Sequence, residues 1–496
     1  MRFEKNRTIG KRGYKSGLIN SMQKCFSFFL NPVSLTLNKI SKSIKSFIIT
    51  ACCFALVGYF VLYFTPSADI RFRLTYDHII CGAVLIILTL FSIEGSLKNV
   101  RWNKLVFYVF FLSGFGIILT SFLHPVGSGY RAFGMMLMVG FPCMYYVWNN
   151  RADYERLYKR LSAATAAVGI LYYCYCFYRA DKGELSIIDS RVTGTFYDSN
   201  MFSMIGMIMV CSSLYMLLVN RNSKLWFLLA AMAMGAGISI VKMGVSRLAI
   251  LVVLGSMVAF PIYYLKTQST FTEAAGLVSK LIRAELLLVA VIVFVLVGNL
   301  MLSLNARAIE AKQIPADSES AAIETETEQL VETEQQTDAV AEGESETLDP
   351  MDRFNTDGMD IDAYTAGRYH IWQGYAQYLN LTGNDFSKAD WAVLTRDTVR
   401  HAHNNFLEIA FRCGVPVACL HILLELMAGI ICLIWLFNPK YKEPYYLFSI
   451  VFMICYTVQS LFDIATLPFE RPAPFYFYMM MIPVFTFGTE RKEELK

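Results

Sequence analysis

The chain has 496 residues and a formal net charge of +4; 55% of its residues are hydrophobic and only 17% are charged. Ordinary soluble proteins have about 25% charged residues, and the mean hydropathy here is +0.43. This composition excludes a set of soluble domains and predicts an all-α, polytopic membrane protein. No basic stretch alternates with base-stacking aromatic residues, so nucleic acid is not an expected partner.

Twelve apolar stretches approach the length of about 20 residues that a helix needs to cross a bilayer. They are 46–66, 78–94, 105–123, 130–148, 161–178, 201–219, 225–241, 248–265, 284–303, 416–437, 445–462 and 473–488. The second, seventh and last are short or interrupted. We therefore expect a helical bundle of about twelve transmembrane helices, nine of them in 46–303 and three in 404–488.

The distribution of charge predicts the orientation of these helices. If both termini lie in the cytoplasm, Lys and Arg in the inside segments outnumber those in the short outside loops by about three to one. This asymmetry indicates a multi-pass protein of the cytoplasmic (inner) membrane. The basic segment 1–45 is too long for a cleavable signal, and we expect either an amphipathic helix on the inner leaflet or a solvated tail. Residues 489–496 form the cytoplasmic C-terminal tail.

One long connection, residues 304–403, falls outside the membrane in this topology. Within it, residues 313–352 contain 13 Asp and Glu and no Lys or Arg. That stretch has no periodic apolar face and is expected to be disordered. The composition then changes: aromatic and apolar residues return at helical spacing around Arg368 and Trp372, and an amphipathic helix is expected just before the membrane segment that begins at 416.

The candidate chemistry lies at the outer ends of the expected spans. No soluble-enzyme motif such as a Gly-rich phosphate loop is present, and we expect no cofactor. His401 and His403 could be metal ligands, but no third ligand stands at a convincing spacing, so no metal site is predicted. A neutral imidazole suits proton removal from a hydroxyl, and a general base is the better interpretation of one of these histidines.

Two arginines are also expected outside, Arg191 and Arg247. Positive charge is disfavoured in short outside loops, and guanidinium groups bind phosphate through paired hydrogen bonds. The pair therefore indicates an outward-facing diphosphate site, although a single loop arginine is ordinary. Glu425 is the one acid well inside a span, where it could pair with another helix or line a cavity.

Together these features resemble the O-antigen ligase and O-antigen polymerase superfamily of membrane glycosyltransferases. The resemblance covers the topology of most of the chain and, at motif level, about 191–250 and 365–420. The matching residues are Arg191, Gly194, Asn200, Ser246, Arg247, Gly367, Arg368, Trp372, His403, Asn404 and Gly414. Three features depart from the family pattern: Val417 stands where a small residue or Tyr is usual, a Gly pair is reduced to Gly383, and the acidic insert is not a family feature.

The resemblance implies an inverting, metal-independent transfer of a glycan from an undecaprenyl diphosphate carrier to a hydroxyl of a glycan or lipid acceptor. Arg191 and Arg247 would hold the diphosphate, and His403 would take the acceptor proton. Asn404 or Glu408 would orient the imidazole, and the remaining candidates for substrate binding are Asn200, His401, Arg368 and Trp372. The motifs do not separate a polymerase from a ligase. A flippase-like transporter and a non-catalytic scaffold remain alternatives, although there is no internal repeat to favour the first.

Overall fold

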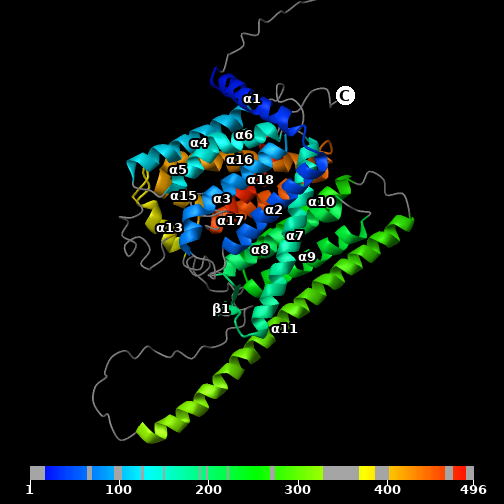
Figure 1. Ribbon diagram of the computed structural model, residues 1–496, viewed down its shortest axis with the longest axis vertical. Coiled ribbons are helices and arrows are strands. Elements are labelled where there is room, and N and C mark those ends of the chain that lie inside the picture. The colour runs from blue at the N-terminus through cyan, green and yellow to red at the C-terminus, as the bar shows by residue number, and fades with distance from the viewer. Residues whose placement is uncertain are drawn as a thin grey trace, which may run out of the picture.

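The computed structural model describes residues 17–63, 70–93, 103–124, 128–148, 151–188, 191–196, 199–219, 223–267, 274–327, 368–385, 401–463 and 473–486. The protein is a helical bundle with one small β-hairpin (Figure 1). The first half comprises α1 (Gly17–Leu37), α2 (Lys42–Tyr63), α3 (Ile70–Phe91), α4 (Lys104–Leu123), α5 (Ser128–Met135), the π-helix η2 (Met136–Gly140), α6 (Phe141–Val147), α7 (Arg151–Asp181), β1 (Ser186–Ile188), β2 (Arg191–Gly194), α8 (Ser199–Val219), α9 (Lys224–Gly244) and α10 (Arg247–Thr267). The second half comprises α11 (Ala274–Thr327), α13 (Arg368–Ala376), α15 (Asn405–Cys413), α16 (Val415–Phe437), α17 (Pro444–Phe462), α18 (Ala473–Met480) and α19 (Ile482–Phe485).

Within the described part of the chain, nine helices are long and apolar enough to cross a membrane. They lie in α2, α4, α7, α8, α9, α10, α11, α16 and α17, and each coincides with one of the twelve expected spans. The prediction of an all-α polytopic membrane protein is therefore confirmed at this level. The other three expected spans, 78–94, 130–148 and 473–488, are also largely helical, but two of them are interrupted. The π-helix η2 separates α5 from α6, and a turn at Met481 followed by Pro483 separates α18 from α19.

Helix α8 forms the centre of the bundle, and nearly all of its residues are buried. It packs against α7, α9, α10 and α17. A Cβ placed on Gly206 of α8 would lie 2.5 Å from the carbonyl oxygen of Gly237 on α9, and a Cβ on Gly237 would lie 2.8 Å from that of Gly206. Small residues at a helix crossing let two backbones approach closely, which is how helices commonly associate in membranes.

Side-chain contacts fix which helix ends lie together. Gln459, near the end of α17, lies 3.7 Å from the sulfur of Met207, in the first half of α8. One turn further along α8, Cys211 lies 3.9 Å from the carbonyl oxygen of Val451 on α17, so these two helices are antiparallel. Tyr263, near the end of α10, donates to the carbonyl of Tyr441 just before α17 begins. Helices α8 and α10 therefore begin at the end of the bundle where α17 finishes at Phe462, which we call the Phe462 end.

Helix α11 is longer than the sequence indicated. The expected span ended at 303 and the following residues were predicted to form a loop, but the helix continues to Thr327 and so includes residues 313–327 of the acidic stretch. Residues 306–312 are rich in Ala, Glu and Lys, which have high helix propensity, and this explains the extension past the apolar part. Residues 328–352 lie outside the described part of the chain. Most apolar side chains between Ile282 and Leu300 are exposed on the outside of the bundle, as expected for a helix that faces lipid.

In the N-terminal segment, helix α1 runs through Pro32 to Leu37, and α2 begins at Lys42. Phe28, Phe29 and Leu35 are exposed on α1. Lys45 at the start of α2 is buried instead of facing a surface, and its ammonium donates to the carbonyl of Ile93 at 3.1 Å.

Candidate functional site

The expected site residues fall into two clusters. The first, the arginine cluster, consists of Arg191, Asn200, Ser246 and Arg247. The second, the histidine segment, consists of residues 401–414 and includes α15. Both lie at the Phe462 end of the bundle, and α13 and α15 appear together at the left of Figure 1.

Arg191 is the first residue of β2 and is half-buried. Its Nε donates to the carbonyl of Gly244, the last residue of α9, at 3.1 Å, and its Nη2 donates to Oδ1 of Asn200 at 3.0 Å. The same Oδ1 accepts a hydrogen bond from the Ser246 hydroxyl at 3.0 Å. A cation is stabilised at the C-terminal end of a helix dipole, so the end of α9 is a favourable position for this guanidinium. The structure thus brings together three residues that the sequence separates by up to 55 positions.

Arg247 is the first residue of α10 and is half-buried. It follows Val245, whose φ of 45° is left-handed, and Ser246, whose hydroxyl accepts a hydrogen bond from the Ala249 N–H at 3.4 Å. A helix N-terminus carries a partial positive charge and favours anions. An arginine at this position adds a positive charge to that of the helix N-terminus, next to Ser246, which is bonded to Asn200.

His403 has a left-handed backbone, with φ of 48°. This conformation is uncommon for a residue with a side chain, and such strain persists only when the surroundings impose it. The neighbours of His403 do so. The Ala402 N–H donates to Glu408 Oε2 at 2.8 Å, and the Ala402 carbonyl accepts from the Trp372 indole N–H at 2.8 Å.

On the other side of His403, Asn404 is fixed at both ends of its amide. Its Oδ1 accepts from the Leu407 N–H at 3.0 Å, which makes it the N-cap of α15, and its Nδ2 donates to the Leu461 carbonyl at 2.9 Å. Asn404 was expected to orient an imidazole or to bind substrate; in the structure both ends of its amide anchor α15 to the end of α17. His403 is thus half-buried and held between two immobilised residues.

Beneath this segment lies a buried ion pair between Glu408 and Arg412 on α15. Glu408 Oε1 is 2.5 Å from both Nε and Nη2 of Arg412, and these two residues are 0% and 1% exposed. The guanidinium also donates to the Tyr130 hydroxyl at 2.7 Å. Burial by itself raises the pKa of the Glu408 carboxyl, but the Arg412 charge, His401 and the Ala402 N–H together outweigh it and lower that pKa to about 2.

His401 rests on this ion pair. Its Nδ1 lies 3.3 Å from Arg412 Nη2 and 3.7 Å from Glu408 Oε1. A guanidinium only donates, so Nδ1 accepts from Arg412 in the tautomer that carries its proton on Nε2, whereas a proton on Nδ1 would point toward Glu408. Glu408 was expected to orient His403 or to bind substrate; the contacts here place its carboxylate beside His401.

Helix α13 supports the histidine segment from the side. Ile371 and Tyr375 form a small apolar cluster with Ala402 and Phe411, and the rings of Tyr375 and Phe411 are 4.9 Å apart. Trp372 belongs to this support through its hydrogen bond to Ala402. Arg368, the first residue of α13, is half-buried.

The end of α15 depends on two glycines with positive φ, Gly383 at 80° and Gly414 at 90°. The turn at 380–384 lies against this end, where the Val415 N–H donates to Asn380 and the Asn384 N–H to Phe411. A Cβ on Gly414 would collide with the Leu381 carbonyl, and a Cβ on Gly383 with that of Arg412. Only glycine allows the two backbone segments to come this close, which explains why the sequence has glycine at both 383 and 414.

Substituting Gly414 with alanine is therefore expected to destabilise the protein by at least about 1–3 kcal/mol, from backbone strain alone. Thermal unfolding of the purified variant in detergent measures the effect. Gly429→Ala on α16 is the matched control, since a Cβ there meets nothing within 4 Å and alanine favours a helix. Equal unfolding temperatures for the two variants would contradict the assigned role of Gly414.

Contacts with α17 place both clusters toward the Phe462 end of the bundle. Asn405, at the start of α15, donates to the Ser460 hydroxyl near the end of α17 at 3.3 Å. Asn200 is seven residues before Met207, the α8 residue that contacts Gln459, which is about 10 Å along a helix axis. The cationic groups and the histidines are therefore presented at the same end of the molecule.

Sequence reasoning missed two residues of this site, Arg412 and Tyr130. The position of Arg412 four residues after Glu408 is the spacing at which charges pair on a helix, so this contact was accessible from the sequence. Tyr130 comes from the distant segment α5, and no local pattern indicated it. Among the described residues, no group of three His, Cys, Asp or Glu could hold a metal ion.

Comparison with known proteins adds no relative: no protein-family model matches this sequence, and no curated protein matches it.

Proposed function

We propose that this protein is a membrane glycosyltransferase that moves a glycan from an undecaprenyl diphosphate carrier to an acceptor hydroxyl at the outer face of the cytoplasmic membrane. The observation that carries the proposal is the immobilised, left-handed His403 at the same end of a membrane bundle as Arg191 and Arg247. The resemblance to O-antigen ligases and polymerases supports it, since the same residues form the matching motifs.

In this proposal the Phe462 end faces the outside and both termini lie in the cytoplasm. The acceptor oxygen attacks the anomeric carbon, the bond from that carbon to the diphosphate oxygen breaks, and the diphosphate leaves with the bonding electrons. The configuration at the anomeric carbon is inverted in this single displacement. His403 takes the proton that the acceptor hydroxyl loses.

The two arginines stabilise the negative charge that grows on the leaving diphosphate. Arg247 is placed at a helix N-terminus, where backbone N–H groups and the dipole also favour an anion. Arg191 is fixed by Gly244 and Asn200, so its charge needs little reorganisation when the substrate binds. Asn200 thus acts by positioning Arg191. His401 and half-buried Arg368 would contact the sugar or the acceptor, and Arg368 supplies further positive charge on α13.

Replacing Arg247 with alanine is expected to lower the transfer rate by about 10²- to 10³-fold, the range for losing one preorganised group that stabilises a developing anion. Arg247→Lys should recover part of this loss because it restores a charge without the paired hydrogen bonds. The rate is measured with carrier-linked glycan in proteoliposomes.

The matched control is Lys242→Ala, which removes an exposed cation from the last turn of α9, where its ammonium contacts Asn299 at 2.9 Å. This variant should transfer at nearly the wild-type rate. An Arg247→Ala protein that is folded and as active as Lys242→Ala would overturn the role of Arg247.

A further inference from the structure

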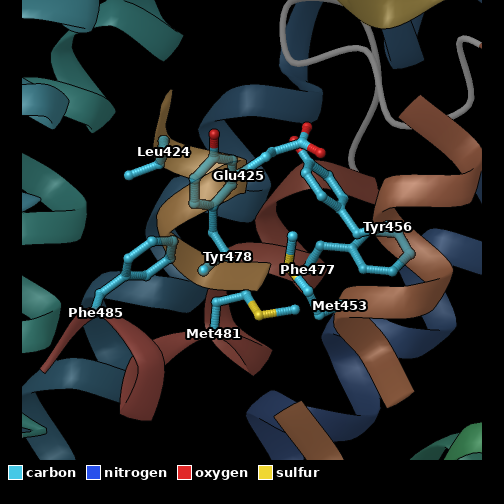
Figure 2. A pocket seen from close by; sticks show the side chains of 9 residues that line it. Leu424, Glu425, Met453, Tyr456, Phe477, Tyr478, Met481 and Phe485 are labelled. Atoms are coloured by element: carbon cyan, nitrogen blue, oxygen red, sulfur yellow. The ribbon is translucent and has the colours of Figure 1, made fainter. Parts of the chain in front are cut away.

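The interior of the bundle is filled around Glu425 of α16. His421 lies one turn earlier on the same helix, with its Nε2 3.4 Å from Glu425 Oε1. Figure 2 shows Glu425 among aromatic and apolar side chains that include Tyr478 and Phe485. Glu425 thus lies against a residue of its own helix, whereas the sequence also allowed a partner on another helix. The apolar surface that still lacks an explanation lies outside the bundle, on α1.

Helix α1 lies at the end of the bundle opposite the Phe462 end. The ring of Phe26 is 6.2 Å from that of Tyr146 in α6, and Tyr146 lines a cavity together with Asn103 at the start of α4. The other end of α4 contacts the end of α15, where the Thr120 hydroxyl donates to the Cys413 carbonyl at 3.0 Å. Helix α1 is therefore level with the ends of the membrane spans, which is the depth of the lipid head groups.

Helix α1 does not follow the direction of the spans. In Figure 1 it runs across the direction of α4, at the edge of the bundle. Its junction with α2 is fixed, because the Lys45 ammonium donates to the Ile93 carbonyl at 3.1 Å and to Asn38 Oδ1 at 3.4 Å. Within the described residues, α1 is not among the helices that are long and apolar enough to cross a membrane. These features indicate a helix that lies along the membrane surface.

The two sides of α1 differ in what they contact. Phe26 and Leu30 pack against the core of the bundle, and Ser34 is buried one turn further on. On the opposite side, Phe28 and Leu35 are 75% and 69% exposed. They are seven residues apart and so lie on one face of the helix. Large apolar side chains exposed together on one face mark a surface that contacts a membrane or a partner.

Basic residues accompany this exposed face. Lys24 is exposed one turn before Phe28, and Lys39 and Lys42 are exposed just after the helix. The first 45 residues contain ten Lys and Arg and a single acid, Glu4. A lysine stem can lie along an apolar surface while its ammonium reaches the head groups. A second copy of the chain would bring the same positive charge and be repelled, whereas an anionic lipid surface is complementary.

We propose that α1 is an in-plane helix that binds the anionic lipid surface of the membrane. Phe28 and Leu35 insert among the acyl chains, and Lys24, Lys39 and Lys42 contact the lipid phosphates. An apolar face flanked by lysines is typical of helices that lie in the membrane interface. In the orientation proposed above, this surface is the inner leaflet. The inference does not depend on the transferase activity.

The test places the photoreactive residue p-benzoylphenylalanine at position 28 of the full chain, in nanodiscs of equal parts dioleoylphosphatidylglycerol and dioleoylphosphatidylcholine. Illumination joins this residue to whatever covers it, and mass spectrometry of the intact protein identifies the adduct. We expect lipid adducts in which phosphatidylglycerol exceeds phosphatidylcholine about fivefold, the ratio for about 1 kcal/mol from one nearby lysine. Combining Lys24→Gln, Lys39→Gln and Lys42→Gln should bring this ratio close to one.

The matched control carries the photoreactive residue at position 26, where Phe26 packs against Tyr146, and should form adducts within the protein. The proposal is overturned if position 28 gives no more lipid adducts than position 26, if it joins two copies of the chain instead, or if the two lipids react equally. Should the triple variant fail to fold, salt decides the role of the lysines. Screening should lower the lipid ratio of the chain with its lysines intact, and a ratio unaffected by salt would contradict that role.

Discussion

Replacing His403 with asparagine is expected to lower glycan transfer by about 10²- to 10⁴-fold, the range for loss of a general base. Asparagine is the informative substitution because it tolerates the left-handed backbone that His403 adopts. It removes the base without adding the strain that alanine would bring at this φ. Transfer is measured with carrier-linked glycan in proteoliposomes, and folding by thermal unfolding.

His401→Asn provides the comparison within the same segment. His401 is partly exposed and contacts the buried ion pair of Glu408 and Arg412. We assign to His401 a hydrogen bond to the substrate and no proton transfer. Its loss should raise KM more than it lowers kcat. If His403→Asn retained wild-type kcat while His401→Asn lost it, the two histidines would have been assigned the wrong roles.

Replacing Glu408 with glutamine is expected to destabilise the protein by about 3–5 kcal/mol, because it leaves the charge of Arg412 buried without a counterion. Arg412 is only 1% exposed. The double substitution Glu408→Gln, Arg412→Met should recover most of the stability, since removing both charges together avoids the unpaired one. Thermal unfolding in detergent measures all three proteins.

The same pair predicts how stability depends on pH. The pKa of Glu408 is lowered from 4.5 to about 2 in the folded protein. A lowered pKa means that folding favours the charged form, so this contribution is fully present above pH 4.5 and is lost as the pH falls toward 2. Unfolding temperatures measured between pH 6 and pH 2 should therefore fall more steeply for the wild type than for the double variant. Parallel curves would contradict the assignment.

The helices could be predicted from the sequence because apolar length is a strong signal that depends on local composition alone. The interruptions were only partly predictable. The last stretch was expected to be short or interrupted, and Pro483 follows its break at Met481, but no local pattern indicated the π-helix at Met136–Gly140. The extent of α11 was missed because hydropathy marks only where the apolar part ends, whereas helix propensity carries the backbone further.

Several residues named from the sequence lie together in the structure, but most of the contacts that hold them could not be predicted. Motif resemblance indicated Arg191, Asn200 and Ser246, and the structure joins them by hydrogen bonds. The N-cap role of Asn404 could have been predicted from the sequence, because Asn is common at the N-cap just before an amphipathic helix. The hydrogen bond between Trp372 and Ala402 joins residues 30 positions apart in the sequence, and no periodicity indicates a contact of that kind.

The most direct test of the central claim is the amount and chain length of carrier-linked glycan in cells that lack this protein, complemented with wild type or with His403→Asn. We predict that wild type restores normal turnover and that His403→Asn does not. Single repeats accumulating on the carrier would identify a polymerase, and long carrier-linked chains that never reach an acceptor would identify a ligase. A carrier-linked pool that is unchanged by loss of the protein would contradict the assignment as a glycosyltransferase.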